Sequence, residues 1–460
     1  MTPTILIGNG LSTLVAAAEL AGKGHPVTIL TDGKNLGGHF AGAQLDGHDF
    51  DLGMVLLEES DHRDTGADLS AYDPAVRNDW TRFGGRVSAW MRSRVGLVRA
   101  KCPECLVGGR LIPDYLIANK LDGLVGVPKP KQLARTDPRH ALNKCAPGLF
   151  DSLTYAEAAV ANHGELFHDQ FIEPFVQKVF GVPSTAFLAR FHRAGWVPLY
   201  YPETLRAASD GQLTSLSEYP FWTTSGGCVA RLVKSMQNTI ARSTNVSVVQ
   251  QTLVSVTKRN SEWTMVTTDG RSYRTERLSI GLPLGRAGSL LNLPIENPKS
   301  AASVVLLLAV VDAARIRIPH GCTMIVDQAY AAYRLTDHDA LAGVDDALHR
   351  VTLEASPLAV ARLYANQTEQ YALKGELANL MGIDINHPRD RDAIRISRCV
   401  TARDAVAIPT PDHVAQANIA ATSISQSAEG ALLSGSLLGY GATSMNDQIV
   451  QGLRIAEQFS

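Results

Sequence analysis

Small residues near the N-terminus are the ones best placed to do chemistry, because residues 8–13 read GNGLST. A β-branched apolar stretch, Thr4–Ile7, precedes this run, and an alanine- and leucine-rich stretch, Leu14–Ala21, follows it. A second apolar stretch lies at Val27–Leu30. Together these patterns predict a strand, a glycine-rich loop, a helix and a second strand within about thirty residues.

Gly8 and Gly10 in this frame predict the binding of a dinucleotide. Gly8 permits the tight turn after the strand, and Gly10 lets a pyrophosphate approach the free N–H groups at the positive end of the helix. Leu11 and Ser12 would then lie beside the phosphates. The third glycine position is Thr13, which is tolerable if the helix packs slightly further from the strand.

The end of the second strand should hold the ribose of the dinucleotide. An acidic residue is usual there, but this chain has Thr31, followed at once by Asp32. Either Asp32 contacts the ribose, or a neutral hydroxyl holds it. Gly37 and Gly38 come soon afterwards and indicate either a second close backbone approach to the same ligand or a plain glycine turn.

The composition excludes several classes of protein. The chain has 460 residues with 43 basic and 45 acidic side chains and a net charge of -2, so it lacks the basic surface of a dedicated nucleic-acid-binding protein. Its length suggests roughly two to four domains of about 100–200 residues. The longest uncharged apolar run, Ala301–Val311, is shorter than the roughly 18 residues of a membrane-spanning helix.

Cysteine and histidine usage favours a cytoplasmic protein without a metal centre. Six cysteines are too few for a disulfide scaffold, and the N-terminus has no basic leader. The Cys102–Cys105 pair indicates either a zinc or redox motif or two small loop residues. The 13 histidines form no recognisable metal-binding motif.

The rest of the chain predicts a helical middle region and a strand-rich second half. We expect helices from residue 74 to 164 and over Leu153–Val179, and a short strand pair over Gln44–Gly53. The polar stretch Arg206–Glu218 indicates either a mobile flap or a surface loop. Further helices are expected at Val229–Ile240 and at the C-terminus, and strands at Val246–Val256, Trp263–Thr268, Ser303–Val311, Thr323–Val326, Ala332–Leu335, Val351–Leu353 and from Leu432.

Three separated segments together resemble one superfamily. Residues 5–53, the stretch NVSVVQQTLVSVTKRNSEWTMVTTDG at 245–270 and the stretch GSLLGYGATSMNDQIVQGLRIAE at 435–457 are similar to the FAD-binding parts of amine oxidases, protoporphyrinogen oxidases and UDP-galactopyranose mutases. The resemblance implies FAD rather than NAD, bound non-covalently. The first βαβ unit alone could not distinguish the two cofactors, because both use it.

The resemblance also implies a fold and a domain plan. It implies an α/β protein with a Rossmann-like, GR2-type FAD-binding domain, a mixed-sheet substrate domain and a helical insertion. We expect a discontinuous FAD-binding domain from residues 1–60, 216–290 and 400–460. A mostly helical domain is expected at 61–215 and a sheet-containing substrate domain at 291–399.

The resemblance implies a set of cofactor-binding residues. They are Gly8, Gly10, Leu11 and Ser12 at the phosphates, Thr31 or Asp32 at the ribose, Lys34, Gly37 and Gly38 in the second flavin-contacting stretch, Val254 at the adenine, Gly435 and Ser436 near the ribityl phosphate, and Met445 and Gln448 at the flavin end of the last helix. A helix N-terminus there would stabilise negative charge on reduced flavin by about 1 kcal/mol.

The mutase-like branch resembles this chain most. The segment FIEPFVQKVFGVP at 171–183 is similar to a mutase and protoporphyrinogen oxidase segment, and Tyr333-Arg334 is similar to a mutase pair whose arginine holds a nucleotide-sugar diphosphate. Arg193, with Arg190 as its competitor, would supply a second guanidinium, and planar guanidinium groups suit phosphates. Additional phenol donors are expected from Tyr200, Tyr201 and Tyr330.

One feature departs from the mutases. Their Gly-x-His that touches the flavin corresponds to Gly53-Met54-Val55 here, which has no histidine. His39 and His48 lie nearby in sequence and are weak candidates for a catalytic role; both are also ordinary loop residues.

Three functions follow as alternatives. The chain is a mutase-like flavoenzyme that acts on a nucleotide-linked sugar through flavin N5, or an oxidoreductase that takes a hydride from a small molecule, or a flavoprotein without catalysis. We expect a small-molecule substrate, no nucleic-acid partner and no membrane span. A homodimer is also compatible with these expectations.

Overall fold

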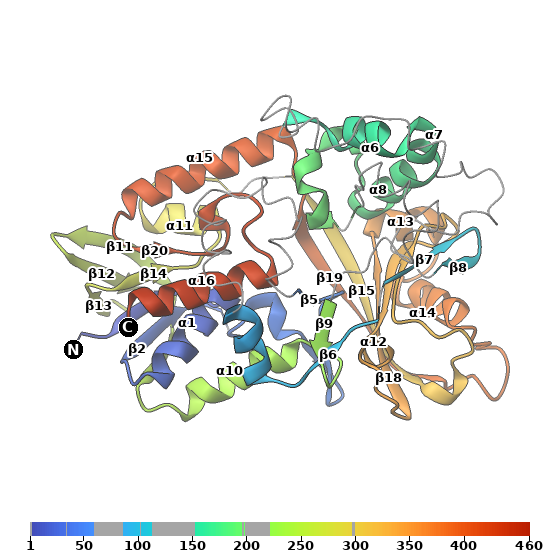
Figure 1. Cartoon of the computed structure of the whole chain (residues 1–460), viewed down its shortest axis with the longest axis horizontal. Coiled ribbons are helices and arrows are strands. Elements are labelled where there is room, and N and C mark those ends of the chain that lie inside the picture. Colours follow the sequence, from blue (N-terminus) through green and yellow to red (C-terminus); the bar gives the residue numbers. More distant parts are fainter. Residues whose placement is uncertain are drawn as a thin grey trace.

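The computed structural model describes residues 2–33, 35–58, 86–101, 103–112, 152–195, 197, 221–296 and 300–460. Two large sheets organise this part of the chain, and both termini lie beside the first of them (Figure 1). Within the described residues, no helix combines the length and the apolar character needed to cross a membrane.

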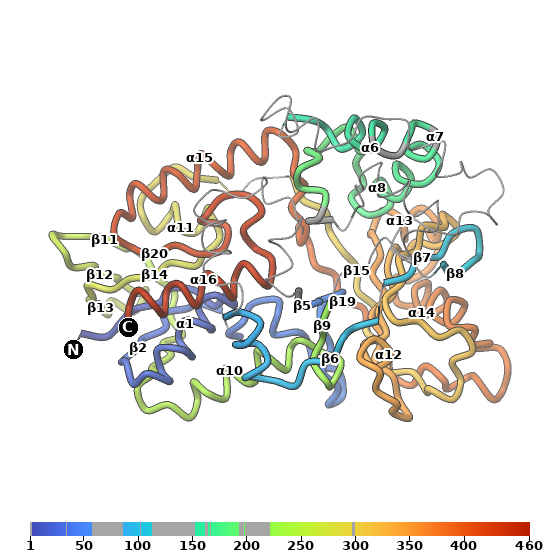
Figure 2. The backbone as a smooth tube through the Cα atoms, in the orientation of Figure 1, coloured from blue at the N-terminus to red at the C-terminus, as the bar shows by residue number. Residues whose placement is uncertain are grey.

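The first sheet is parallel and holds the predicted βαβ unit. Its five strands lie in the order β10-β2-β1-β14-β20, and each neighbouring pair is parallel. Figure 2 shows that this half of the molecule combines segments from the start, middle and end of the chain. The strands are β1 (Thr4–Ile7), β2 (Val27–Thr31), β10 (Val246–Gln250), β14 (Leu278–Ile280) and β20 (Leu432–Leu433).

Both faces of the first sheet are covered, as a buried parallel sheet requires. On one face α1 (Leu11–Gly22), α10 (Ala230–Arg242) and α16 (Met445–Gln458) share an apolar core with Leu6 and Ile29. The other face packs with a three-stranded meander and two helices. These elements are β11 (Leu253–Arg259), β12 (Glu262–Thr267), β13 (Ser272–Thr275), α11 (Leu284–Leu290) and α15 (Pro411–Ser427).

The second sheet is mixed and has seven strands in the order β19-β15-β18-β17-β16-β7-β8. Only the β16–β7 pair among its neighbours is parallel. The strands are β7 (Glu104–Val107), β8 (Arg110–Ile112), β15 (Ala301–Asp312), β16 (Cys322–Ile325), β17 (Ala332–Asp337), β18 (Leu348–Ala355) and β19 (Ile394–Ala407).

Alternate residues of this sheet face two separate cores. Even-numbered residues of β15 pack with α6 (Tyr155–His163) and α8 (Glu173–Phe180). Odd-numbered residues of β15 pack with α13 (Pro357–Leu363) and α14 (Glu369–Leu380). The face that packs with α6 and α8, called below the α6–α8 face, also contacts Phe50 and Met54.

Two small sheets lie between the large ones. One is the hairpin of β3 (Ala43–Leu45) and β4 (His48–Phe50), which confirms the strand pair expected there. The other is β5-β9-β6 (Figure 1), whose strands are β5 (Leu57–Glu58), β6 (Leu97–Arg99) and β9 (Phe221–Thr224).

The expected α/β class is confirmed, and some element bounds differ. The helix expected over Leu153–Val179 is broken, because α6 ends at Gly164, which has a φ of +85°. A short helix, α7 (Glu165–Phe167), and a wide helical turn at His168–Ile172 precede α8. The second sheet also takes β7 and β8 from the expected helical segment, and β19 runs past the expected boundary at 399.

Candidate functional site

Gly8 occupies a position that admits only glycine. Its φ is +121°, and a Cβ built there would lie 2.2 Å from the carbonyl oxygen of Gly281. The backbone N–H of Gly8 donates to Leu30 at 2.9 Å, and that of Gly281 donates to Ile7 at 2.8 Å. The loop after β1 therefore turns sharply while it touches the loop after β14.

The N-terminus of α1 has backbone donors to offer. Gly10 precedes the helix with extended backbone and has no side chain to cap it. Gln448 Oε1 accepts the N–H of Leu11 at 3.1 Å. Among the described residues, neither Ser12 nor Thr13 finds an acceptor for its backbone N–H. A helix start of this kind binds anions such as phosphate.

The second glycine pair lies against the first glycine loop. The N–H of Gly37 donates to the carbonyl of Asn9 at 2.7 Å. A Cβ on Gly38 would lie 3.8 Å from Gly10 Cα. Both glycines have positive φ angles. The structure thus places Gly37 and Gly38 beside the predicted phosphate loop, and His39 follows directly with an exposed side chain.

The C-terminal segment reaches the same place. Ser12 Oγ donates to Ser434 Oγ at 2.9 Å. The N–H of Gly435 donates to Gln451 Oε1 at 2.7 Å, and the side-chain amide of Gln451 donates to Ala442 at 2.9 Å. A Cβ on Gly435 would have nothing within 4 Å. Open space therefore lies over this glycine, next to α1.

Arg286 links the residue after β2 to the first residue of β11. Arg286 Nη2 donates to the carbonyl of Leu253 at 2.7 Å, and its Nε lies 3.7 Å from Asp32 Oδ2. Thr31 is buried, and its hydroxyl accepts the N–H of Gly33 at 2.9 Å. Val254 is 55% exposed, which suits a residue that covers a ring. Asp32 is thus the more accessible acceptor for a ribose.

A dinucleotide fits these residues. Three segments far apart in sequence meet at the N-terminus of α1, which offers N–H donors and is surrounded by glycines. Phosphate charge there would be stabilised by the helix dipole. The adenosine end would then lie toward Asp32 and Val254, at the carboxyl ends of the parallel strands, where open α/β sheets bind their ligands.

A β-bulge shapes the Tyr333–Arg334 pair. Ala332 pairs with Ala355 and Arg334 with Glu354, so one extra residue lies in β17. Tyr333 joins the core with α6 and α8, whereas Leu335 joins the opposite core. Strict alternation along a strand would turn Arg334 away from Tyr333, but the bulge resets the alternation, and both side chains reach Glu354.

Arg334 has an anionic partner within the chain. Its Nε and Nη2 donate to Glu354 Oε1 and Oε2, both at 2.5 Å. Burial alone would lower the pKa of Arg334, but the Glu354 carboxylate raises it above its ordinary value. The hydroxyl of Tyr333 lies 3.4 Å from Glu354 Oε2.

Glu354 also contacts the segment that corresponds to the mutase Gly-x-His. The N–H of Met54 donates to Glu354 Oε1 at 3.0 Å. Gly53 has a φ of +90°, and a Cβ there would lie 2.9 Å from Glu354 Oε2. The Glu354 carboxylate therefore contacts the backbone of Gly53 and Met54, which lies between β4 and β5. The sequence analysis did not identify Glu354.

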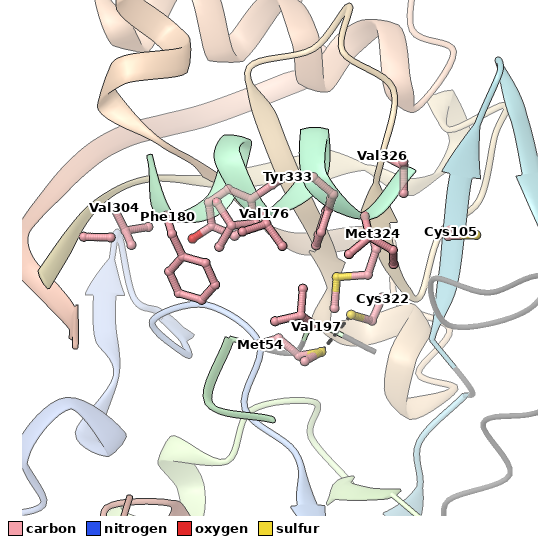
Figure 3. Packing of buried hydrophobic residues seen from close by; sticks show 14 of the residues in the cluster. Met54, Cys105, Val176, Phe180, Val197, Val304, Cys322, Met324, Val326 and Tyr333 are labelled. Atoms are coloured by element: carbon pink, nitrogen blue, oxygen red, sulfur yellow. Dashed lines mark hydrogen bonds between the residues drawn. The ribbon is translucent and has the colours of Figure 1, made fainter. Parts of the chain in front are cut away.

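Apolar and sulfur-containing side chains surround this polar group on the α6–α8 face (Figure 3). Cys322 Sγ lies 2.9 Å from Met54 Sδ, and both side chains are buried. Val176 and Phe180 come from α8 and point toward Tyr333 and Met324 of the sheet (Figure 3). The surroundings of Gly53–Val55 are therefore mainly apolar.

One set of possible metal ligands occurs among the described residues. Atoms of Asp51, Cys228 and His338 lie within 4.8 Å of one another. Arg350 Nη1 lies 3.2 Å from Cys228 Sγ, and both Asp51 oxygens accept N–H groups at the start of α10. A guanidinium in contact with the thiol disfavours a cation there.

Several predicted residues lie apart from this site or outside the described part. Met445 is buried in the core between α1 and α16. His48 pairs with Leu45 in the hairpin. Tyr330 lines a cavity of 460 Å³ with Tyr364 and Tyr371, next to the opposite core. Outside the described residues are Lys34, Cys102, Tyr200, Tyr201, the segment Arg206–Glu218 and the side chain of Arg193.

Arg190 and Ser436 are described and make local contacts. The Arg190 guanidinium lies 4.6 Å from the centre of the Phe191 ring. Ser436 Oγ donates to the carbonyl of Leu282 at 3.4 Å. Cys105 of the CxxC pair is buried in β7.

Sequence comparisons identify the N-terminal unit. Residues 6–69 match the family described as NAD(P)-binding Rossmann-like domain. The chain is also 40% identical over 52 residues to a 4,4'-diapophytoene desaturase (4,4'-diaponeurosporene-forming) from Staphylococcus haemolyticus (strain JCSC1435). That match covers 11% of this chain and 10% of the desaturase, so it concerns a short segment of each protein.

Solved structures resemble the whole chain. A reduced UDP-galactopyranose mutase gives a TM-score of 0.67 at 14% identity, over 100% of this chain and 95% of the mutase. Cyclohexylamine oxidase from Brevibacterium oxydans IH-35A gives 0.62 at 14% identity, over 100% and 99%. Putrescine oxidase bound to putrescine gives 0.62 at 12% identity, over 100% and 98%. These likenesses confirm the expected fold, a Rossmann-like dinucleotide-binding half joined to a mixed-sheet half.

Proposed function

We propose that this protein binds FAD non-covalently and acts as an oxidoreductase that takes a hydride from a small organic molecule. The observation that carries the proposal is the meeting of three separated segments at the start of α1, around Gly10, Gly38 and Gly435. The resemblance of these segments to FAD-binding parts selects FAD over NAD, and the similarity of the fold to two amine oxidases supports the reaction class.

FAD, when bound, would supply the hydride acceptor. Ser12, whose N–H at the start of α1 has no acceptor among the described residues, would bind the pyrophosphate, whereas the N–H of Leu11 is already donated to Gln448. Asp32 would accept hydrogen bonds from the ribose. Gly53–Val55 would lie at the flavin, as the resemblance implies, and Glu354 holds Met54 in place there. The apolar side chains of the α6–α8 face of the second sheet would exclude water from the reacting bond of the substrate.

Mutase chemistry is the second candidate, favoured by the Tyr333–Arg334 pair. Two guanidinium N–H groups of Arg334 are already bound to Glu354, which weakens its case as a diphosphate ligand. The buried pair has little net charge to attract an anion. We therefore place the oxidoreductase first. A cytoplasmic location and a homodimer stay predictions.

Gly10→Val tests the cofactor site. Beyond its neighbours in the chain, a Cβ on Gly10 would come no closer than 3.4 Å to another atom, Gln448 Oε1, so the fold should tolerate it. The valine would nevertheless fill the space that a pyrophosphate must enter. We expect the purified wild type to be yellow and to release FAD on acid precipitation. The variant should keep its thermal unfolding profile in the absence of flavin and lose FAD; full flavin occupancy in the variant would contradict the proposal.

Flavin absorbance tests the reaction class. Under anaerobic conditions, primary amines and other small reductants are mixed with the oxidised holoprotein. An oxidoreductase should bleach with its substrate and recolour in air. A mutase should instead respond, only after reduction, to nucleotide diphosphates. A response to nucleotide diphosphates alone would reverse our order of the two candidates.

A further inference from the structure

We propose that Glu354 and Arg334 form a compensated charge pair beside the bound flavin, in which each charge cancels the effect of the other on the reduction potential, with Glu354 as a positioning residue for Gly53–Val55. This inference rests on the proposed function, because it requires FAD in the site. It concerns two residues that contact each other and the flavin-facing backbone, rather than the chemistry of the substrate.

The pair is buried and bidentate. The exposed fractions of the Arg334 and Glu354 side chains are 13% and 5%, and the two donor–acceptor distances are both 2.5 Å. Charges in such surroundings are poorly screened, so each one acts strongly on nearby groups. The two opposite charges largely cancel at a distance while both are present.

The carboxylate lies directly against the backbone of Gly53 and Met54. It accepts the Met54 N–H at 3.0 Å and leaves no room for a Cβ on Gly53. If Gly53–Val55 touches the flavin, the nearest charged groups of the second sheet are this carboxylate and its guanidinium. Removing one partner would expose the flavin to the charge of the other.

The sign of each effect follows from electrostatics. Flavin gains electrons on reduction, so an unpaired Arg334 cation would stabilise the reduced form, and an unpaired Glu354 anion would destabilise it. Glu354→Gln should therefore raise the reduction potential, and Arg334→Gln should lower it. A role in packing alone gives no reason for shifts of opposite sign.

The experiment is dye-coupled reductive titration of the FAD-loaded protein. For each single variant we expect at least about a tenfold change in the ratio of reduced to oxidised flavin, which equals about 30 mV for a two-electron couple. The double variant Arg334→Gln/Glu354→Gln should return close to the wild-type potential, because no net charge is unmasked.

A second buried ion pair in the same sheet provides the matched control. Asp339 and Arg350 are also joined by two hydrogen bonds, at 2.5 and 3.1 Å. Arg350 and Glu354 lie four positions apart on β18, a separation of about 13 Å along a strand. Asp339→Asn should therefore shift the potential much less than Glu354→Gln does.

The outcomes separate the inference from the proposed function. Single variants that retain FAD but shift the potential in the same direction, or not at all, would overturn the inference and leave the FAD proposal standing. A wild-type protein that binds no FAD would overturn both. If a single variant cannot be purified folded, Arg334→Met/Glu354→Met replaces the pair by apolar groups, and a potential far from wild type would count against the charge balance.

Discussion

Gly8 is the residue on which the conformation of the dinucleotide loop depends most. Its positive φ and its contact with Gly281 both exclude a side chain. Gly435 also has a positive φ, +66°, but a Cβ there would meet nothing within 4 Å. A side chain at Gly8 would therefore meet both a steric clash and backbone strain, whereas a side chain at Gly435 would meet backbone strain alone. Comparing the two positions separates the two contributions to the free energy of unfolding.

Gly8→Ala should destabilise the protein by about 3 kcal/mol, because it adds a steric clash to the strain of a left-handed backbone. Gly435→Ala should cost only about 1 kcal/mol, the strain alone. Denaturant unfolding of both variants, without added flavin, measures the difference. Equal losses would show that the contact with Gly281 adjusts at little cost.

Residue types in a local pattern were predictable from the sequence, and partners brought in from elsewhere were not. The glycines of the first loop and the Gly37–Gly38 turn lie together as expected. Glu354 was missed because it is 300 positions from Met54 and lies one residue beyond the strand expected at Val351–Leu353. The bulge at Tyr333 leaves no mark in the sequence, so the side of the sheet on which Arg334 lies could not be predicted from strand alternation.

The packing of α1 on α16 sets the position of the dinucleotide loop. A Cβ on Gly452 of α16 would lie 2.5 Å from Val15 Cβ and 2.7 Å from the carbonyl oxygen of Ser12. The missing side chain therefore lets the two helices approach closely. Gly375, in the interior of α14, has nothing within 4 Å of such a Cβ.

Gly452→Ala should cost about 2 kcal/mol through overpacking and, by displacing α1, should weaken FAD binding about tenfold. Gly375→Ala should instead stabilise the protein by about 0.5–1 kcal/mol, because alanine favours helices more than glycine does. Thermal unfolding and flavin titration of both variants test this contrast. A Gly452→Ala protein as stable as Gly375→Ala would mean that the helix contact is loose.

Lys178 anchors α8 to the second sheet. Its ammonium donates to the carbonyls of Ile325, Asp327 and Ala332 at 2.9, 2.6 and 3.3 Å. Lys178→Met should cost about 3 kcal/mol, because buried acceptors lose their donor. Lys374→Met, on the half-exposed side of α14, is the control and should change the free energy of unfolding by less than about 0.5 kcal/mol. Similar small changes in both variants would contradict the anchoring role.

Elements with strong periodicity were predictable, and those without it were not. The strands β1, β2 and β15 lie close to their expected bounds, whereas the single strand expected over Val246–Val256 is divided into β10 and β11, which belong to different sheets. No element was expected between residues 354 and 431, yet α13, α14, β19 and α15 lie there. The alternation of β19 is obscured by exposed charged residues such as Arg403 and Asp404, so its pairing with β15 supplies the order that its own pattern does not.

At the scale of the whole molecule, a buried polar network joins the two halves. Asp51 caps α10 of the first half by accepting the N–H groups of Val229 and Ala230 at 2.8 and 2.9 Å. Arg350 of the second half donates to the carbonyls of Asp49 and Gly226 at 3.1 and 2.5 Å. Such a junction could not be read from the sequence, because its members are up to 301 positions apart.

His338 makes the stability of this junction depend on pH. Burial, and then the nearby Arg350 guanidinium, lower the pKa of His338 from 6.5 to about 3. The unfolded state therefore binds a proton between about pH 6.5 and pH 3 that the folded state refuses, so stability falls as the pH drops through this window. At pH 4 the contribution of His338 to the loss relative to pH 7 should be on the order of 3 kcal/mol. It is opposed by Asp51, because burial raises the pKa of that carboxyl to about 7 and its protonation favours the folded state as the pH falls.

His338→Gln should remove this part of the acid dependence while its amide can still bond to Thr352, the present partner of the imidazole at 2.8 Å. We expect the variant to lose less free energy of unfolding than the wild type between pH 7 and pH 4, as measured by urea denaturation at each pH. His387→Gln, at an exposed histidine, controls for the loss of an imidazole at the surface. Parallel pH profiles for His338→Gln and the wild type would contradict the lowered pKa, because they would mean that the folded junction accepts the proton as readily as the unfolded chain does.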